Sequence, residues 1–95
     1  MKRSFIYILA NDYNTVLYIG VTTNLLKRIY QHRNHEVDGF SSKYNLHKLV
    51  YFKEYSTIQD AIKREKQLKK WNREWKIELI NGFNPEWKDM YPQIL

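Results

Sequence analysis

Two short apolar segments near the start of the chain predict a β-hairpin. Residues 5–10 and 16–20 are runs of strand-forming side chains, and the residues between them, 11–14, favour turns. The first run is too short for the core of a signal peptide, so we interpret it as a strand. Gly20 ends the second run, where the chain must turn sharply or approach a ligand closely.

A helix and a third strand follow the hairpin. Capping residues at 22–24 precede a helix predicted over residues 25–35, where apolar side chains recur at helical spacing. Residues 34–45 contain Gly39 and several serines and asparagines, so we expect this segment to be mostly loop. Residues 47–55 are rich in aromatic and branched side chains and predict the third strand.

The C-terminal half predicts two more helices and a final turn. Residues 56–57 cap the first of these helices. One face of this helix is expected to carry Ala61, Ile62, Glu65, Leu68 and Lys69. The helical period slips at residues 71–72, so we expect a break there and then a short helix that ends at Gly82. Asparagine and proline at 84–85 are typical of a cap and the first position of a last helical turn.

These elements predict one α+β domain over residues 1–95. It should contain a small three-stranded antiparallel sheet flanked by helices, in the order ββαβα with a short C-terminal helix. The 95 residues are 43% hydrophobic and include no cysteine, which excludes disordered chains, disulfides, zinc–thiolate sites and cysteine nucleophiles. No apolar stretch approaches the length of a membrane span, so we expect a cytoplasmic protein without a membrane partner.

The formal net charge of +6 favours a polyanionic partner such as nucleic acid. Much of the charge lies in residues 63–76, which also hold Trp71 and Trp75. Basic side chains there could contact phosphates while the indoles stack on bases; the alternative is a solvated helix face with structural tryptophans. The residues expected to bind nucleic acid are Lys27, Lys43, Lys63, Lys66, Lys69, Lys70 and Arg73.

A few side chains could carry chemistry. Arg28 and His32 lie one helical turn apart and point the same way, and a guanidinium matches phosphate oxygens; the alternative is an exposed basic face. Glu65 falls on an apolar helix stripe, where a carboxylate needs a partner. That partner is either Arg28, in a structural ion pair, or a metal ion. A single carboxylate suits Mg²⁺ or Mn²⁺, which favour oxygen ligands and keep bound waters.

Two tyrosines complete the candidate site. Tyr7 and Tyr18 occupy the middle of the two hairpin strands, and their side chains could share a face, depending on register. A nearby Arg28 would favour the phenolate form of either tyrosine. The alternative is that both rings simply pack in the core.

The ordered set of these motifs resembles the GIY-YIG endonuclease superfamily, in particular its small stand-alone bacterial members. The matching segments are residues 5–7 (Phe-Ile-Tyr), 18–20 (Tyr-Ile-Gly), 21–28, 61–71 and 84–89, together with His32. The resemblance covers almost the whole chain. It implies a three-stranded antiparallel sheet flanked by helices and cleavage of a DNA phosphodiester with one divalent metal ion.

The resemblance also implies roles. By position, Tyr7 and Tyr18 match the two family tyrosines, Arg28 the helix arginine, His32 the histidine one turn further on, and Glu65 the metal-binding glutamate. Phe5 departs from the glycine that names the first motif, which affects the backbone rather than the chemistry. Asn81 is the nearest candidate for a late family asparagine. Either tyrosine could be the general base; we favour Tyr7, with Tyr18 orienting water or phosphate.

We therefore expect a metal-dependent DNA endonuclease or nicking enzyme, using one Mg²⁺ or Mn²⁺ ion, in DNA repair or processing. One alternative is a weak or inactive nucleic-acid-binding module of the same fold; another is a structural protein with a buried Glu65–Arg28 pair. RNA remains a possible partner besides DNA. A monomer or weak homodimer is expected, with specificity supplied by DNA structure or by a protein partner.

Overall fold

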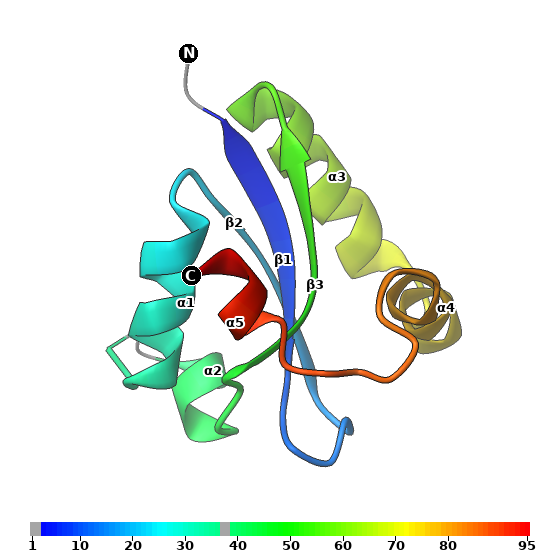
Figure 1. Cartoon of the computed structure of the whole chain (residues 1–95). Helices are drawn as coiled ribbons and strands as arrows, with labels where there is room; N and C mark the ends of the chain where they lie inside the picture. Colours follow the sequence, from blue (N-terminus) through cyan, green and yellow to red (C-terminus); the bar gives the residue numbers. More distant parts are fainter. Residues whose placement is uncertain (1–2, 37–38) are drawn as a thin grey trace.

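The computed structural model describes residues 3–36 and 39–95, which form a three-stranded antiparallel sheet with helices on both faces (Figure 1). The strands, in the spatial order β2-β1-β3, are β1 (Ser4–Ala10), β2 (Leu17–Thr22) and β3 (Lys48–Tyr55). The helices are α1 (Leu25–Arg33), α2 (Phe40–Lys43), α3 (Ile58–Lys70), α4 (Arg73–Phe83) and α5 (Tyr91–Ile94). The predicted α+β fold is confirmed.

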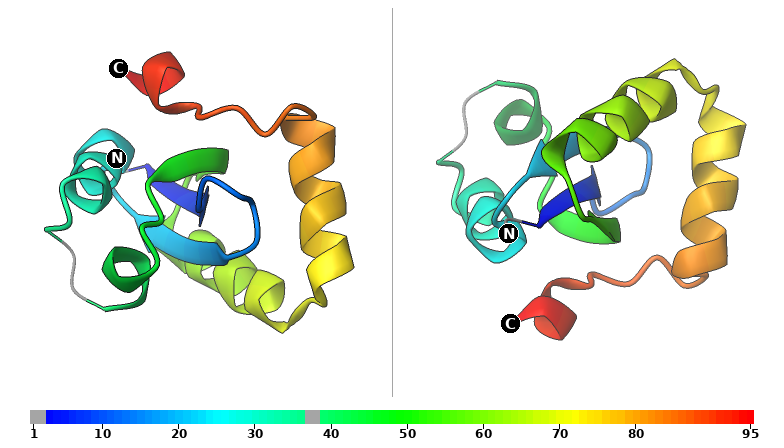
Figure 2. Two further views of the ribbon diagram at one scale, coloured as in Figure 1. Left: turned by 90° about the horizontal axis from the view of Figure 1, so that it is seen from below. Right: turned by 90° about the horizontal axis from the view of Figure 1, so that it is seen from above.

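The central strand β1 is buried on both faces, which explains its continuous apolar run. One face of the sheet is covered by α1 and α5, and the other by α3 and α4, as the two views in Figure 2 show. The buried side chains that pack together on the first face are Tyr7, Leu9, Leu25, Ile29, Leu46 and Leu49. Those of the second face include Ile6, Ile8, Ala10, Val50, Ala61, Leu68 and Ile80.

The hairpin turn and the helix starts follow from side-chain hydrogen bonds. Asn11 Oδ1 accepts from the backbone N–H groups of Thr15 and Val16, which closes the turn between β1 and β2. The side chains of three capping residues accept from the backbone N–H three residues further on and fix the starts of α1, α3 and α4: Asn24, Thr57 and Asn72. The predicted break at residues 71–72 is confirmed, because the backbone at Trp71 is extended between α3 and α4.

Several predicted boundaries in the first half are wrong. The first helix ends at Arg33 instead of residue 35, since His35 adopts a left-handed backbone conformation with φ of 56°. The second strand continues past Gly20 to Thr22. The segment predicted as mostly loop contains the short helix α2, which begins after Gly39 in a positive-φ conformation.

The C-terminal prediction also needs correction. Helix α4 runs through Gly82 to Phe83. Asn84 follows it as a C-cap rather than starting a new helix, and its buried amide donates to the carbonyl oxygens of Val50 and Lys88. The last helix begins at Tyr91, so residues 84–85 do not start it.

The tail packs on its own domain. Asp89 forms an ion pair with Arg33 and accepts a hydrogen bond from the backbone N–H of Leu49, while the Arg33 guanidinium lies 4.5 Å from the centre of the Tyr91 ring. These contacts close the face of the sheet that carries Tyr7. Within the described ranges, every helix falls short of the length and apolarity needed to cross a bilayer.

Candidate active site

A buried chain of hydrogen bonds links β1, α1 and α2. The hydroxyl of Tyr7 lies 3.0 Å from Nε2 of His32, and Nδ1 of His32 lies 2.8 Å from Oγ of Ser41. All three side chains are buried. Because both ring nitrogens are held, the orientation of the imidazole is fixed relative to the tyrosine.

The ring of Tyr7 occupies a place that only glycine leaves open. In the register of the hairpin, Tyr7 pairs with Gly20 and Leu9 pairs with Tyr18. A Cβ atom on Gly20 would lie 2.4 Å from both Cζ and the hydroxyl oxygen of Tyr7. The close approach that Gly20 suggested is therefore that of the Tyr7 ring, which lies across β2 towards the edge of the sheet.

Tyr18 stands beside this pair. Its ring centre lies 6.2 Å from that of Tyr7 and 5.4 Å from that of His32. The register accounts for this cluster, because Tyr7, Leu9 and Tyr18 all point to the same face of the sheet. Tyr18 is only half-buried, so the cluster is open on its side.

The surroundings shift the acidity of both buried partners. Burial is the main cause that raises the pKa of Tyr7 above its usual value of 10. Tyr18 and the charge of Glu65 raise this pKa further, whereas the charge of Arg28 lowers it. Burial, followed by the charge of Arg28, lowers the pKa of His32 from 6.5 to about 4. At neutral pH the pair is therefore an uncharged phenol and an uncharged imidazole, in which one of the two hydrogen-bonded ring nitrogens carries no proton.

This shift predicts a pH dependence of stability. Between pH 6.5 and about 4 the unfolded state binds a proton at His32 that the folded state does not. Acidification should therefore destabilise the fold through this residue, by about 2 kcal/mol at pH 5, and the loss should be absent above about pH 7.5. Urea unfolding of wild type and His32→Gln at these two pH values measures the difference. If both proteins lose the same stability, the depressed pKa is wrong.

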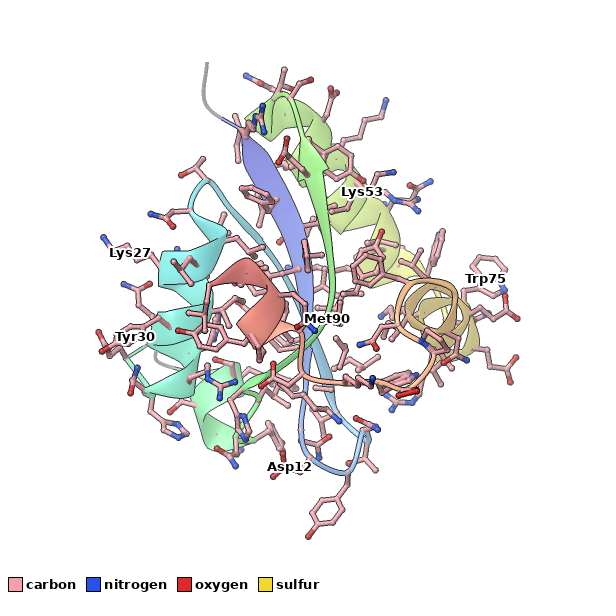
Figure 3. The ribbon with its side chains drawn as sticks, in the orientation of Figure 1. Asp12, Lys27, Tyr30, Lys53, Trp75 and Met90 are labelled. Carbon is pink, nitrogen blue, oxygen red and sulfur yellow. The ribbon has the colours of Figure 1, made fainter. Side chains whose placement is uncertain are left out.

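Arg28 lines an open pocket at the start of α1. The pocket has a volume of about 370 Å³ and is formed by Thr22, Thr23, Asn24, Lys27, Arg28 and Gln31. Arg28 is half-buried and stands one helical turn before His32 on α1, and its charge lowers the pKa of both Tyr7 and His32. Lys27 points outward from α1 at the same place (Figure 3). Two cationic side chains therefore face an anion that enters this pocket.

Glu65 approaches from α3 on the other side of the edge strand. Its side chain is 18% exposed and its carboxylate lies 3.3 Å from Nζ of Lys69. Helix α3 packs on both β1 and β2, and β2 is an edge strand, so side chains from both faces can meet beyond it. The charge of Glu65 is the smallest of the influences on the pKa of Tyr7, which it raises. In the part of the chain that the structure describes, the ion pair of Glu65 is with Lys69 and not with Arg28.

The environment of Glu65 fits a divalent ion. Mg²⁺ is commonly held by one or two carboxylates and keeps several waters, and the carboxylate of Glu65 is accessible to solvent. A site built from three or more His, Cys, Asp or Glu side chains does not occur among the described residues. The side chain of Lys69 is 56% exposed, so its ion pair with Glu65 does not seal the carboxylate from solvent.

The seven residues predicted to bind nucleic acid are all exposed, but they do not share one face. Lys27 and Lys69 flank the tyrosine cluster from α1 and α3. Lys63 and Lys70 point away from the sheet, since they lie opposite Ala61 and Leu68 on α3. Lys66 lies on the flank of α3 near Glu65, and Lys43 lies on α2. Arg73 lies at the start of α4, where its guanidinium donates to the backbone carbonyl of Asn14.

The structure changes the expectations for Asn81 and for the face of α3 that packs on the sheet. Asn81 accepts a hydrogen bond from Nε1 of Trp87, so it joins the C-terminal segment to α4. Ile62 and Lys69 were expected on the face of α3 that packs on the sheet, yet Ile62 is 38% exposed and the side chain of Lys69 is 56% exposed. Ala61 and Leu68 are buried as predicted. Helix α3 therefore contacts the sheet along a narrower stripe, which leaves the flank with Glu65 and Ile62 near the edge.

Ser41 is a site residue that sequence reasoning missed. It lies in α2, a helix of four residues that is too short to produce a periodic pattern. Two serines follow Phe40 at this point of the sequence, and nothing distinguishes the buried Ser41 from the half-buried Ser42 before the fold is known. Its partner His32 was identified, and the contact to Ser41 supplies the anchor that holds it.

The type of domain follows from the order of these side chains along the fold. Two neighbouring strands carry tyrosines, the following helix carries an arginine and a histidine, and a later helix carries a glutamate. A sequence model described as the GIY-YIG catalytic domain matches residues 3–78. The chain therefore belongs to the GIY-YIG family, and the resemblance noted from the sequence is confirmed.

The curated relatives are UPF0213 proteins of bacteria. The one from Syntrophus aciditrophicus is 34% identical over 90 residues, which covers 90% of this chain and 98% of the relative. One from Clostridium perfringens is 38% identical over 83 residues, covering 83% of this chain and 84% of the relative. The solution NMR structure of a UPF0213 protein from Bacillus halodurans superposes with a TM-score of 0.59 over 93% of both chains at 20% identity, which shows the same fold.

Proposed function

We propose that this protein is a divalent-metal-dependent DNA endonuclease or nicking enzyme. One observation carries the proposal: the phenol of Tyr7 is hydrogen-bonded to His32, Tyr18 lies beside it, and Arg28 lines an open pocket one helical turn before His32. An ion pair between Arg28 and Glu65 would have left these charges satisfied by each other. Instead, Glu65 pairs with Lys69, and Arg28 lines a pocket that is open to solvent next to the buried pair of Tyr7 and His32.

The buried pair would remove the proton from the attacking water. As water oxygen bonds to phosphorus, its proton passes to the Tyr7 oxygen and the Tyr7 proton passes to Nε2 of His32. Nε2 of His32 lies 3.0 Å from the phenol oxygen, so the proton would move along an existing hydrogen bond and the phenolate would not exist as a free species. The lowered pKa of His32 makes its protonated form short-lived, and the proton would then pass to solvent. The bond to the leaving oxygen breaks and that oxygen takes a proton from solvent.

Arg28 would stabilise the charge that grows on the phosphate. Its guanidinium forms charge-assisted, bidentate hydrogen bonds with phosphate oxygens, and these strengthen as phosphorus becomes pentacoordinate. Glu65 would hold a Mg²⁺ or Mn²⁺ ion, with water in the remaining positions. Such an ion neutralises phosphate charge and lowers the pKa of water. Tyr18, beside Tyr7, would orient the water or the phosphate.

DNA would approach along the edge of the sheet at β2. Lys27 on α1 and Lys69 on α3 stand on either side of the tyrosine cluster and are exposed. Contacts of these lysines with phosphates would supply affinity without sequence specificity and would weaken with salt. This arrangement suits an enzyme whose specificity comes from DNA structure or from a protein partner.

The test is a cleavage assay on a panel of DNA substrates. We expect wild-type protein to cut or nick at least one of branched, nicked, single-stranded or duplex DNA when Mg²⁺ or Mn²⁺ is present. Excess chelator should stop the reaction, because it removes the cation that would neutralise the phosphate charge, and the negative carboxylate of Glu65 cannot do so alone. Binding without cleavage of any substrate under either metal would instead make the protein a nucleic-acid-binding module of the same fold.

A further inference from the structure

A shallow hollow lies next to the tyrosine cluster, at the outer edge of β2. It has a volume of about 250 Å³ and is lined by Leu17, Tyr18, Ile19, Phe40, Lys69 and Lys76. These residues come from β2, α2, α3 and α4, so the hollow spans the edge of the sheet. Its volume is below the range of pockets for drug-sized ligands, which suits a smaller group such as a single base. Tyr18 belongs both to the hollow and to the proposed active site.

Exposed aromatic rings continue from Tyr18 over α2. The ring of Phe40 lies 6.5 Å from that of Tyr18 with the planes 24° apart, and the ring of Tyr44 follows at 4.7 Å from Phe40. Phe40 is 47% exposed and Tyr44 is 41% exposed. We call Phe40 and Tyr44 the aromatic platform. Neither ring is needed to close the core, since both keep a large part of their surface in solvent.

Positive charge surrounds the aromatic platform. Lys69 and Lys76 line the hollow from α3 and α4, and Nζ of Lys43 lies 5.4 Å from the centre of the Tyr44 ring. Aromatic faces beside lysines are the combination that binds single-stranded nucleic acid, because bases stack on the rings while the backbone phosphates meet the cations. A protein partner with an apolar patch would not need this charge.

We propose that the aromatic platform stacks an unpaired base of the DNA strand that is cut, next to the scissile phosphate. The substrate class would then be DNA with a single-stranded nucleotide at the cleavage position, such as a flap, a gap or a frayed end. The position of the scissile phosphate rests on the proposed function; the stacking of an unpaired base on Phe40 does not.

The same short helix connects the platform to the buried relay. Ser41 of α2 holds His32, and Phe40, the residue before it, stands in the aromatic platform. Gly39 starts this helix with φ of 97°, a conformation that side chains rarely adopt. A base stacked on Phe40 therefore rests on the element that orients the proton acceptor of the site.

The experiment measures binding in the presence of chelator, so that no cleavage is required. Two DNA oligonucleotides differ only in whether a 2-aminopurine base lies in a single-stranded flap or within blunt duplex. We expect Phe40→Ala to weaken binding of the flap about 5-fold or more and to leave the duplex unchanged, since stacking on an aromatic ring contributes about 1–3 kcal/mol per base. Wild type should change the fluorescence of the flap base, and Phe40→Ala should abolish that change.

Controls separate stacking from folding. Phe40→Trp should retain binding, whereas Phe40→Leu keeps an apolar contact to Tyr18 but should bind the flap as weakly as Phe40→Ala. Tyr13→Ala, at an 85% exposed ring in the β1–β2 turn, should bind both oligonucleotides like wild type. Equal losses on flap and duplex, no loss on either, or a changed oligomeric state without a loss of flap binding would each overturn the proposal. Failure of all cleavage assays would refute the proposed function but leave the stacking result intact.

Discussion

Replacing Glu65 by glutamine is expected to reduce metal-dependent cleavage by about 100-fold or more. The amide keeps the size of the side chain but not its charge, and bound-metal stabilisation of a phosphoryl transition state is worth several kcal/mol. The fold should survive, because the residue loses only a partly exposed pair with Lys69 on the same helix, worth about 0.5 kcal/mol or less. Rates at saturating Mg²⁺ or Mn²⁺ measure the effect.

Glu86→Gln is the matched control. Glu86 also pairs with a lysine, Lys88, at 3.0 Å, but it lies in the exposed segment after α4. This variant should cleave at the wild-type rate. A second measurement does not depend on cleavage: Mn²⁺ should raise the melting temperature of wild type and of Glu86→Gln, but not of Glu65→Gln, because an ion that binds only the folded state stabilises it. Equal activity of Glu65→Gln and wild type would show that Glu65 holds no catalytic ion.

The sequence predicted the fold well because its strongest local signals agree with the tertiary structure. The apolar run of β1 is continuous since both faces of that strand are covered. The predicted caps Asn24 and Thr57 accept from backbone N–H groups and mark the starts of α1 and α3, and the predicted break at residues 71–72 separates α3 from α4. Such signals depend on residues three or four apart, which a sequence displays directly.

The parts that could not be predicted depend on contacts between distant residues. The proximity of Tyr7 and Gly20 is set by the hairpin register, and a shift by one residue would turn Tyr7 to the opposite face. The contact of Ser41 with His32 required α2, whose four residues carry no periodic pattern. At the other end, residues 84–85 satisfied a local rule for starting a helix, but the buried amide of Asn84 is instead bound to β3.

In the candidate site, the tyrosine and the histidine are buried, whereas the arginine and the glutamate remain partly exposed to solvent. Burial keeps Tyr7 protonated and His32 uncharged, so neither group carries charge at neutral pH. Arg28 and Glu65 stay near solvent, where a phosphate and a cation can reach them. The edge position of β2 makes this possible, because side chains from both faces of the sheet meet there without crossing the core.

Replacing Gly20 by alanine is expected to damage both stability and activity. The new methyl group would lie 2.4 Å from Cζ and the hydroxyl of Tyr7, whereas an ordinary contact between carbon atoms is about 3.5–4.0 Å. The ring must therefore move by about 1 Å, which strains its hydrogen bond to His32. Overpacking of this kind costs about 1–3 kcal/mol, and a misplacement of about 1 Å can lower a catalytic rate about 100-fold.

Gly82→Ala provides the comparison, because a Cβ atom there would meet nothing within 4 Å and the residue lies inside α4. It should leave cleavage unchanged and stabilise the protein by about 0.5 kcal/mol through helix propensity. A double-mutant cycle identifies the cause of the Gly20→Ala loss: in a Tyr7→Leu background, where no ring lies over β2, the same substitution should cost much less stability. If Gly20→Ala costs as much without the ring as with it, backbone strain rather than the approach of Tyr7 explains why glycine stands at this position.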